Sequence, residues 1–160
     1  MDLAKNLQLP GKTAVITGAS KGIGAAIAEA LGRAGARVVV SSRKQEAVDA
    51  LADRIRQDGI DATAVAANVG KPEDLEQLVQ HSLDTYDGID ILVNNAAANP
   101  VFGPVENTEP WAFQKIMDVN VRGPFELAKL TLPVMRARGG GAIINISSIG
   151  GLSPEPQLGI

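Results

Sequence analysis

Strand-like and helix-like segments alternate along this 160-residue chain, and that alternation restricts its fold more than any other feature. Short runs rich in β-branched residues end in polar or glycine-rich turns, and stretches with helical apolar spacing separate them. The expected strands are Thr13–Thr17, Arg37–Ser42, Ala62–Val69, Asp90–Asn95 and Gly141–Ser148. This alternation predicts an α/β fold with helices on both faces of a parallel sheet. The length, residues 1–160, suits one such domain and is too short for two.

The segments between the expected strands predict helices. The first helix follows a glycine-rich turn, places Ile23 on its apolar face and ends at Gly35. Another helix begins at Pro72 and carries acidic residues in its first turn, as helix amino termini favour. A long helical region runs from Pro110 to Arg138, and Asn120 within it, followed by a glycine and a proline, predicts a kink or bulge.

Composition and charge narrow the possible partners and sites. The net charge is −3 with both signs interspersed, so no binding to nucleic acid or to an anionic membrane is expected. The chain has no cysteine and one histidine, His81, which we assign to a helix surface, so no metal site is expected. No stretch approaches the roughly 18 consecutive apolar residues of a membrane span, and the amino terminus lacks an apolar targeting segment. We therefore expect a cytoplasmic protein.

The turn after the first expected strand reads TGASKGIG, with glycines in the spacing G-x-x-x-G-x-G. Backbone without Cβ atoms can approach a phosphate closely, and the amino terminus of the next helix offers free N–H groups and a positive dipole. A tight turn without any ligand is the alternative, but the position after the first strand of a βαβ unit favours a nucleotide site. The residues expected to bind the nucleotide here are Gly18, Ser20, Lys21, Gly22, Ile23 and Gly24.

The end of the second expected strand indicates which nucleotide is bound. Folds selective for NAD place an acidic residue there to hold the ribose 2′-hydroxyl. This chain has Ser42, Arg43 and Lys44 instead, and Lys21 adds a positive charge from the glycine turn. An arginine holds a 2′-phosphate through charge-assisted hydrogen bonds, whereas a carboxylate would repel it. We therefore expect NADP(H) in preference to NAD(H), unless Arg43 and Lys44 merely begin a solvated helix.

Four motifs occur together in a fixed order: TGASKGIG, NNAA (Asn94–Ala97), VNVRG (Val119–Gly123) and IINISS (Ile143–Ser148). Their order and spacing resemble those of the short-chain dehydrogenase/reductase family, and the resemblance covers essentially every residue. The segments NPVFGP and SSRK are similar to NADP-dependent carbonyl reductases and 3-oxoacyl reductases within that family. The resemblance implies a Rossmann-type doubly wound parallel sheet with strand order about 3-2-1-4-5.

The resemblance also assigns further cofactor contacts. Asn68 and Val69 would contact adenine, with Asn68 in place of the usual aspartate and its oxygen still able to accept from the adenine amino group. Asn94, Ala96 and Ala97 would line the ribose and nicotinamide side. Ala97 stands where the family has glycine, so its methyl group would restrict that loop.

Two catalytic residues follow from the same resemblance. Ser148, rather than Ser147, would hydrogen-bond the substrate carbonyl, and Asn120 would support the helix kink and the proton relay. Reduction of a ketone also needs an acid for the developing alkoxide. The family's catalytic tyrosine would stand immediately after Ile160, with a lysine four residues later. The one tyrosine present, Tyr86, is expected to be structural.

We therefore expect the chain to be the amino-terminal, cofactor-binding part of the family fold, with the carboxyl-terminal part missing. Apolar residues on the last strand and the long helix would then be exposed, which predicts self-association or marginal stability. The expected partners are a small-molecule carbonyl or alcohol substrate and further copies of this chain.

These features predict an oxidoreductase that transfers hydride between NADP(H) and a carbonyl or alcohol. The isolated chain is expected to be inactive because its proton donor is absent. Two alternatives stay open: a non-catalytic nucleotide-binding or assembly module, and a processed subunit whose remaining segment belongs to another polypeptide.

Overall fold

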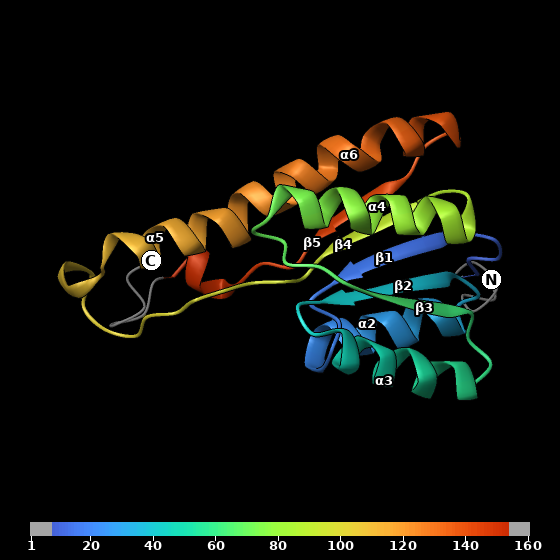
Figure 1. The fold of residues 1–160 in the computed structure, drawn as a ribbon, viewed down its shortest axis with the longest axis horizontal. Coiled ribbons are helices and arrows are strands. Elements are labelled where there is room, and N and C mark those ends of the chain that lie inside the picture. The colour runs from blue at the N-terminus through green and yellow to red at the C-terminus, as the bar shows by residue number, and fades with distance from the viewer. Residues whose placement is uncertain (1–7, 154–160) are drawn as a thin grey trace.

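A five-stranded parallel sheet organises residues 8–153, which the computed structural model describes. The strand order is β3-β2-β1-β4-β5 (Figure 1). The strands are β1 (Thr13–Thr17), β2 (Arg37–Ser42), β3 (Ala62–Ala66), β4 (Ile91–Asn94) and β5 (Ala142–Asn145). Every neighbouring pair runs parallel. The predicted α/β fold and strand order are therefore confirmed.

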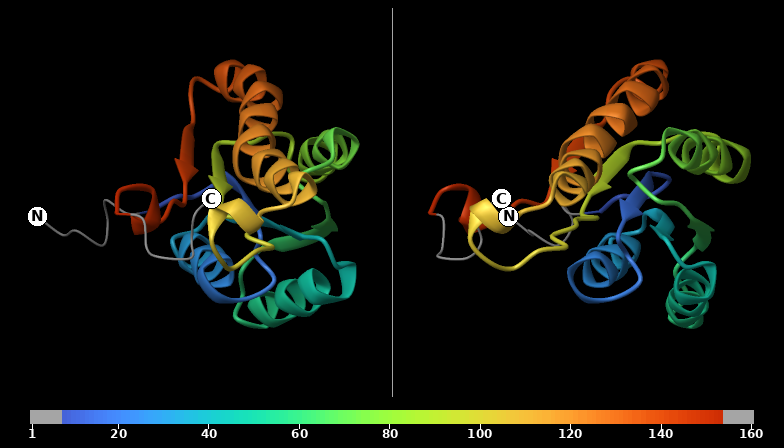
Figure 2. Two further views of the ribbon diagram at one scale, coloured as in Figure 1. Left: turned by 90° about the vertical axis from the view of Figure 1, so that its left-hand side faces the viewer. Right: turned by 60° about the vertical axis from the view of Figure 1, so that its left-hand side comes forward.

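Helices cover both faces of this sheet, as expected (Figure 1). One face carries α2 (Gly22–Arg33) and α3 (Gln45–Gln57), and the other carries α4 (Pro72–Tyr86) and α6 (Gly123–Ala137). The helix α5 (Pro110–Met117) stands beyond the carboxyl ends of the strands (Figure 1), at the end of the molecule that faces the viewer in the left view of Figure 2. Short helical segments complete the chain: the 3₁₀ turns η1 (Val105–Asn107) and η3 (Ile149–Gly151), and the π-helix η2 (Asp118–Arg122).

The valines of β2 show how the two faces are filled. Val38, Val39 and Val40 are all fully buried, as their continuous run predicts for a central strand of a parallel sheet. Val38 and Val40 pack with the residues of α2 and α3, whereas Val39 packs with those of α4 and α6. The alternation of side chains along a strand thus supplies both cores from one short segment.

Three strands are shorter than their apolar patterns predict, and β4 is shorter by one residue at each end. β3 ends at Ala66 and not at Val69, because the chain turns there: the Asn68 side-chain oxygen accepts a hydrogen bond from Gly70 N at 3.1 Å. This asparagine turn replaces the ladder bonds of a longer strand. β5 ends at Asn145, three residues before the predicted end, and its chain continues into the η3 turn.

The first helix presents small residues, and not Ile23, to the sheet. Ile23 is 64% exposed, whereas Gly24, Ala25 and Ala28 are buried against β1 and β2. Small side chains let the helix axis approach the strands closely, so a bulky residue at the first turn has to point away. The expected inward position of Ile23 is therefore wrong.

The edge strand β5 and the helix beside it leave apolar side chains uncovered. β5 lies at the end of the sheet with one unpaired edge, and it contains neither a charge nor a proline that would protect that edge. The exposed flank expected from the sequence is thus present among the described residues, and the self-association drawn from it stays a prediction. Its members are Phe125, Leu132, Ile144, Ile146, Ile149 and Leu152.

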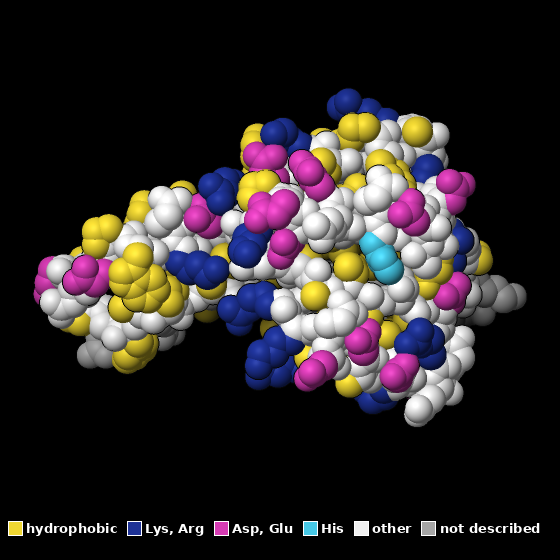
Figure 3. Space-filling model, in the orientation of Figure 1, with side chains coloured by type: hydrophobic (Ala, Val, Ile, Leu, Met, Phe, Trp, Pro, Cys, Tyr) yellow, Lys and Arg dark blue, Asp and Glu magenta, His cyan; other side chains and the backbone are white. Residues whose placement is uncertain are grey.

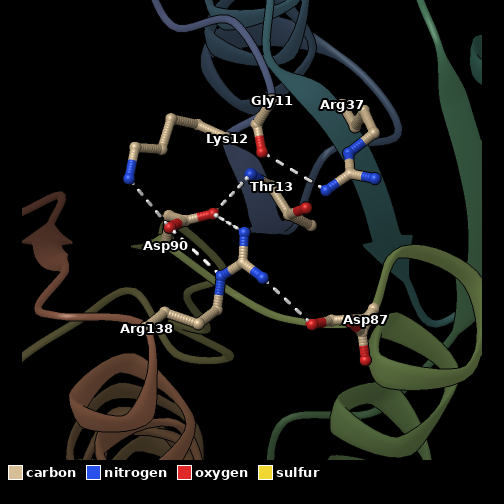
Figure 4. A network of polar contacts seen from close by, with 7 residues as sticks. All are labelled: Gly11, Lys12, Thr13, Arg37, Asp87, Asp90 and Arg138. Atoms are coloured by element: carbon tan, nitrogen blue, oxygen red, sulfur yellow. Dashed lines mark hydrogen bonds and ion pairs between the residues drawn. The ribbon is translucent and has the colours of Figure 1, made fainter.

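Asp90 joins three elements at the amino end of the sheet (Figure 4). Its carboxylate is 3% exposed and accepts a hydrogen bond from the backbone N–H of Thr13, at 2.9 Å, at the start of β1. Arg138, just after α6, donates to both carboxylate oxygens at 3.3 and 3.2 Å, and Lys12 Nζ lies 3.1 Å away. Two cations and one backbone donor therefore satisfy a single buried charge.

Burial by itself would raise the pKa of Asp90, because it removes water from the charged form. The hydrogen bonds from Thr13, Arg138 and Lys12 outweigh that effect and hold the pKa below its usual value. The folded protein thus binds a proton at Asp90 less readily than the unfolded chain does. The stabilisation is fully present above the unfolded-state pKa of about 3.9 and is lost as the pH falls through the lower folded-state value.

Asp90→Asn is expected to lower the free energy of unfolding at pH 7 by about 2 kcal/mol, less than for a fully buried pair because Lys12 and Arg138 are partly exposed. Urea denaturation at pH 7 and at about pH 3 should show that the difference in free energy of unfolding between Asp90→Asn and the parent is smaller at the lower pH. Asp58→Asn, which breaks an exposed pair with Arg33, is the control and should change the value by less than about 0.5 kcal/mol. Equal stability of Asp90→Asn and the parent at pH 7 would contradict this account.

Candidate functional site

Two adjoining cavities open at the carboxyl ends of the strands, where parallel α/β sheets bind their ligands. The first has a volume of about 530 Å³ and the second about 650 Å³. Their walls share Ile23, Asn95, Ala96 and Ala97, so they form two parts of one groove. The predicted cofactor residues in the wall of the first cavity are Gly18, Ser20, Lys21, Gly22, Ile23, Ser42, Arg43, Asn68, Val69, Ala96 and Ala97.

The glycine turn between β1 and α2 forms the floor of the first cavity. Gly18 and Gly22 have φ values of 65° and 60°, in the left-handed region that favours glycine. A Cβ atom on Gly24 would lie 2.6 Å from the Gly18 carbonyl oxygen and 2.6 Å from Asn95 Nδ2. Gly24 itself is buried and does not line the cavity, so its role is to let the turn and the neighbouring loop approach each other.

Asn95 holds the glycine turn to the loop after β4. Its side-chain amide donates to the carbonyl oxygens of Thr17 and Gly18 at 2.9 and 3.1 Å. The Thr17 hydroxyl in turn accepts hydrogen bonds from the backbone N–H groups of Asn95 and Ala96, both at 3.1 Å. Sequence reasoning did not single out Asn95, although its place between Asn94 and Ala96 in the NNAA motif was the available signal.

Positive charge dominates the wall of the first cavity. Lys21 comes from the glycine turn, Arg43 from the residue after β2, and Lys115 from the last turn of α5. No aspartate or glutamate is among the described residues that line this cavity. Lys115, which the sequence analysis missed, is half-buried and makes no hydrogen bond or ion pair with the described residues. Figure 3 shows lysine and arginine side chains gathered at the notch between the α5 end of the molecule and its body.

Lys44 and Ala97 differ from what their motifs predict. Lys44 is the exposed residue just before α3 and does not line the cavity, so the structure does not bring it to the other cations. Ala97 is exposed, and its φ is not positive. Among the described non-glycine residues, only Asp87 has a positive φ. The methyl group of Ala97 is therefore accommodated without backbone strain.

The turn after β3 closes the adenine side expected from the sequence. Asn68 and Val69 both line the first cavity, and Val69 is also buried in the core. The Asn68 oxygen proposed for the adenine amino group already accepts from Gly70 N, but a carbonyl oxygen has two lone pairs and keeps room for another donor. The backbone N–H of Asn68 donates to the Asp74 carboxylate at 2.8 Å, which fixes the start of the turn.

The second cavity is lined by the two predicted catalytic residues, Asn120 and Ser148, and by Asn94, which was predicted to contact the cofactor. Asn94 is buried at the end of β4 and donates to Asn145 Oδ1 at 2.8 Å, across the pair that the β4–β5 register places side by side. Ser148 is exposed and its hydroxyl oxygen accepts from Gly150 N at 3.2 Å. Asn145, which the sequence analysis did not name, thus ties the strand that leads to Ser148 to its neighbour.

The predicted kink at Asn120 is a π-helix. The segment η2 places one extra residue in the turn between α5 and α6, a feature that often marks functional sites. The Asn120 amide donates to the Ala98 carbonyl oxygen at 2.9 Å, and its oxygen accepts from Ala98 N at 2.8 Å. Asn120 therefore holds the loop that separates the two cavities.

A family model described as "short chain dehydrogenase" matches residues 12–160. The chain belongs to the short-chain dehydrogenase family. This family of oxidoreductases combines a glycine turn, an asparagine-rich loop and a serine-bearing strand at one end of a Rossmann-type sheet, which is the arrangement found in this chain.

Individual relatives agree with the family. The bovine (Bos taurus) dehydrogenase/reductase SDR family member 4 is 43% identical over 157 residues, which are 98% of this chain and 56% of that protein. A metagenomic short-chain oxidoreductase solved in complex with NADP is 37% identical with a TM-score of 0.88, covering 93% of this chain and 67% of that one. A 7α-hydroxysteroid dehydrogenase complexed with NADH and 7-oxo glycochenodeoxycholic acid is 34% identical with a TM-score of 0.93, covering 99% and 61%. The chain thus spans little more than half of the bovine relative.

Groups able to donate a proton are scarce around the second cavity. Its described wall contains no tyrosine, lysine, histidine, aspartate or glutamate. Tyr86 lies at the other end of the sheet, where its hydroxyl donates to Asp61 at 2.7 Å beside the start of β3, and burial together with Asp61 raises its pKa. Its expected structural role is confirmed. The segment 154–160, interpreted above as the approach to a catalytic tyrosine, lies outside the described residues.

Residues 8–153 hold no cluster of three or more histidine, aspartate or glutamate side chains placed to bind a metal ion. His81 is half-buried on α4, with Nε2 2.9 Å from the Thr63 hydroxyl, and so it covers β3 and is not a plain surface residue. No described helix combines the length and apolar character that crossing a membrane requires.

Gly24→Ala is expected to lower the free energy of unfolding by about 1–3 kcal/mol, because the new methyl group would press on the Gly18 backbone and on Asn95. Gly22→Ala is the matched control: no atom lies within 4 Å of its Cβ position, so only backbone strain of about 1–2 kcal/mol applies. Chemical denaturation of both variants measures the two effects. In addition, Gly24→Ala should weaken nucleotide binding by displacing Asn95. A stable Gly24→Ala protein would show that the close approach is not required.

Proposed function

We propose that this chain is the nucleotide-binding part of an oxidoreductase that prefers NADP(H) and acts on a small carbonyl or alcohol compound. The observation that carries the cofactor preference is the charge of the first cavity, where Lys21, Arg43 and Lys115 meet without a carboxylate in the described wall. Such a wall attracts the extra 2′-phosphate that distinguishes NADP(H) from NAD(H). One similar structure contains NADP and another contains NADH, and the charges of this chain support the proposal of NADP(H).

The residues present fit a dinucleotide. Gly22 lines the first cavity and has no atom within 4 Å of its Cβ position, which leaves the backbone of the turn open to a phosphate. The helix α2 begins at this residue, so its first N–H groups are available to the same ligand. Ser42 and Arg43 stand at the end of β2, where the adenosine ribose of a dinucleotide lies in this type of fold. When bound, the nicotinamide supplies or accepts the hydride.

Residues of the second cavity act on the substrate in this proposal. The Ser148 hydroxyl, which accepts from Gly150 N, keeps its own proton free to donate to a carbonyl oxygen. Asn120 and Asn145 do not need to touch the substrate: Asn120 holds the loop at Ala98, and Asn145 holds the strand before Ser148. A hydroxyl donor held in place, such as that of Ser148, stabilises the negative charge that develops on the substrate oxygen.

The same cavity limits the turnover proposed for the 160 residues alone. General acid catalysis contributes about 10²–10⁴-fold to such reactions, and the described wall offers no group suited to it. This observation also favours a second candidate function, a non-catalytic nucleotide-binding module. The exposed apolar side chains of β5 and α6 support association of such chains into homo-oligomers.

NADPH is expected to raise the melting temperature of the chain more than NADH at the same concentration. Arg43→Asp should weaken NADPH binding by about 10–100-fold, since it replaces a charge-assisted bond with repulsion. The affinities of this variant for NADPH and NADH should therefore become similar. Thermal shift and calorimetric titration measure both effects. Lys44→Gln is the control, because Lys44 does not line the cavity and should leave the preference unchanged. Greater stabilisation by NADH in the parent chain would overturn the preference for NADP(H).

Oxidation of NADPH with a panel of ketones is expected to be close to background for this chain, because the described wall of the second cavity holds no tyrosine, lysine, histidine, aspartate or glutamate to act as the general acid. Absorbance at the NADPH band follows the reaction. If turnover occurs and Ser148→Ala abolishes it while Ser147→Ala does not, the non-catalytic candidate is wrong and the role of Ser148 is supported.

A further inference from the structure

The turn between β3 and α4, residues 67–71, forms the wall of the first cavity that faces the expected adenine position. Asn68 and Val69 supply side chains to that wall, and Asp74 holds the start of the turn through the Asn68 N–H. The far end of the turn, at Gly70, is held from a different part of the chain. That second anchor belongs neither to the glycine turn nor to the predicted cofactor residues.

Arg122, the last residue of the π-helix, provides this anchor. Its Nη2 donates to the Gly70 carbonyl oxygen at 3.2 Å, across 52 residues of sequence, and its Nη1 lies 3.3 Å from Asp118 Oδ1 within η2. One guanidinium therefore joins the turn to the helix segment. A planar group with donors on both sides suits this two-ended contact better than the single ammonium of lysine.

Close packing accompanies the Arg122 contact. A Cβ atom on Gly123 would lie 2.5 Å from the Val69 carbonyl oxygen, so the turn rests directly on the backbone where α6 begins. Val119 packs against Gly70, with its Cγ2 3.3 Å from the Cβ position of that glycine, and also lines the first cavity. The π-helix thus contributes to the cavity wall and to the support behind it.

We propose that Arg122 is a positioning residue for nucleotide binding, which it serves by holding the 67–71 turn in the conformation that receives the adenosine half. The inference rests on the proposed function of the first cavity. Arg122 itself does not line either cavity, so it acts through Asn68 and Val69 and not by contact. A turn already fixed before binding avoids the entropy loss of ordering it on the ligand.

The test measures the affinity of the parent chain and of Arg122→Gln for 2′,5′-ADP and for NADPH by calorimetry. We expect both affinities to fall by the same factor, about 3–10-fold, because the lost bond supports the wall that both ligands share. Arg122→Lys should restore part of the affinity, since one donor can still reach the Gly70 carbonyl oxygen. This partial recovery also keeps the proposal open to test should the glutamine variant fold poorly.

Arg54→Gln is the matched control. Arg54 also makes an ion pair between two elements, with Glu29 of α2, but it does not line either cavity. Arg54→Gln should change the free energy of unfolding of the ligand-free chain by about as much as Arg122→Gln does. It should leave the affinities for 2′,5′-ADP and for NADPH unchanged. Equal affinities of Arg122→Gln and the parent, or a loss confined to NADPH, would overturn the role of Arg122. Failure of the parent chain itself to bind either ligand would instead contradict the proposed function, and this inference with it.

Discussion

The backbone of the glycine turn and the loop after β4 touch at Asn95, and both cavities depend on that contact. The amide of Asn95 donates to two successive carbonyl oxygens, those of Thr17 and Gly18, and it fits because Gly24 has no side chain. The contact fixes the amino terminus of α2 relative to β4. It therefore sets where a phosphate would meet the first helical N–H groups and where the loop with Ala96 and Ala97 divides the groove.

The two ends of the sheet have different tasks. At the amino end, Asp90 and Tyr86 are buried and each is paired with partners of the protein itself, Asp90 with Thr13 and two partly exposed cations and Tyr86 with Asp61. The carboxyl end holds Ser148, Arg43 and other polar groups that line open cavities. Donors and cations that the protein does not satisfy internally are available to a ligand. This division explains how one sheet combines a rigid foundation with a site that can bind and release a small molecule.

Many elements could be predicted from short apolar patterns in the sequence. Features that depend on contacts between distant segments could not be predicted in this way. The bounds of β1 and β2 follow from the sequence because a buried valine-rich run begins and ends abruptly. β3 was predicted too long because Asn68 forms a turn with Gly70 that apolar pattern does not reveal. Lys115 and Asn145 were missed for a related reason, since Lys115 reaches the first cavity from α5, far along the chain from the glycine turn, and Asn145 meets Asn94 through the β4–β5 register. Ile23 was placed inward because helical spacing does not report how closely a helix approaches a sheet. The family motifs nonetheless identified most of the residues that line both cavities.

The π-helix also determines the rotational phase of everything that follows it. An α-helix turns by about 100° per residue, so the extra residue in η2 rotates α6 by that angle relative to an uninterrupted continuation of α5. The same insertion that brings Asn120 to Ala98 thereby selects which side of α6, with Leu127 and Met135, is buried against the sheet. A change of one residue in length at this point would alter the site and the core together. Length in this segment is therefore constrained twice, once by the chemistry of the groove and once by the packing of the fold.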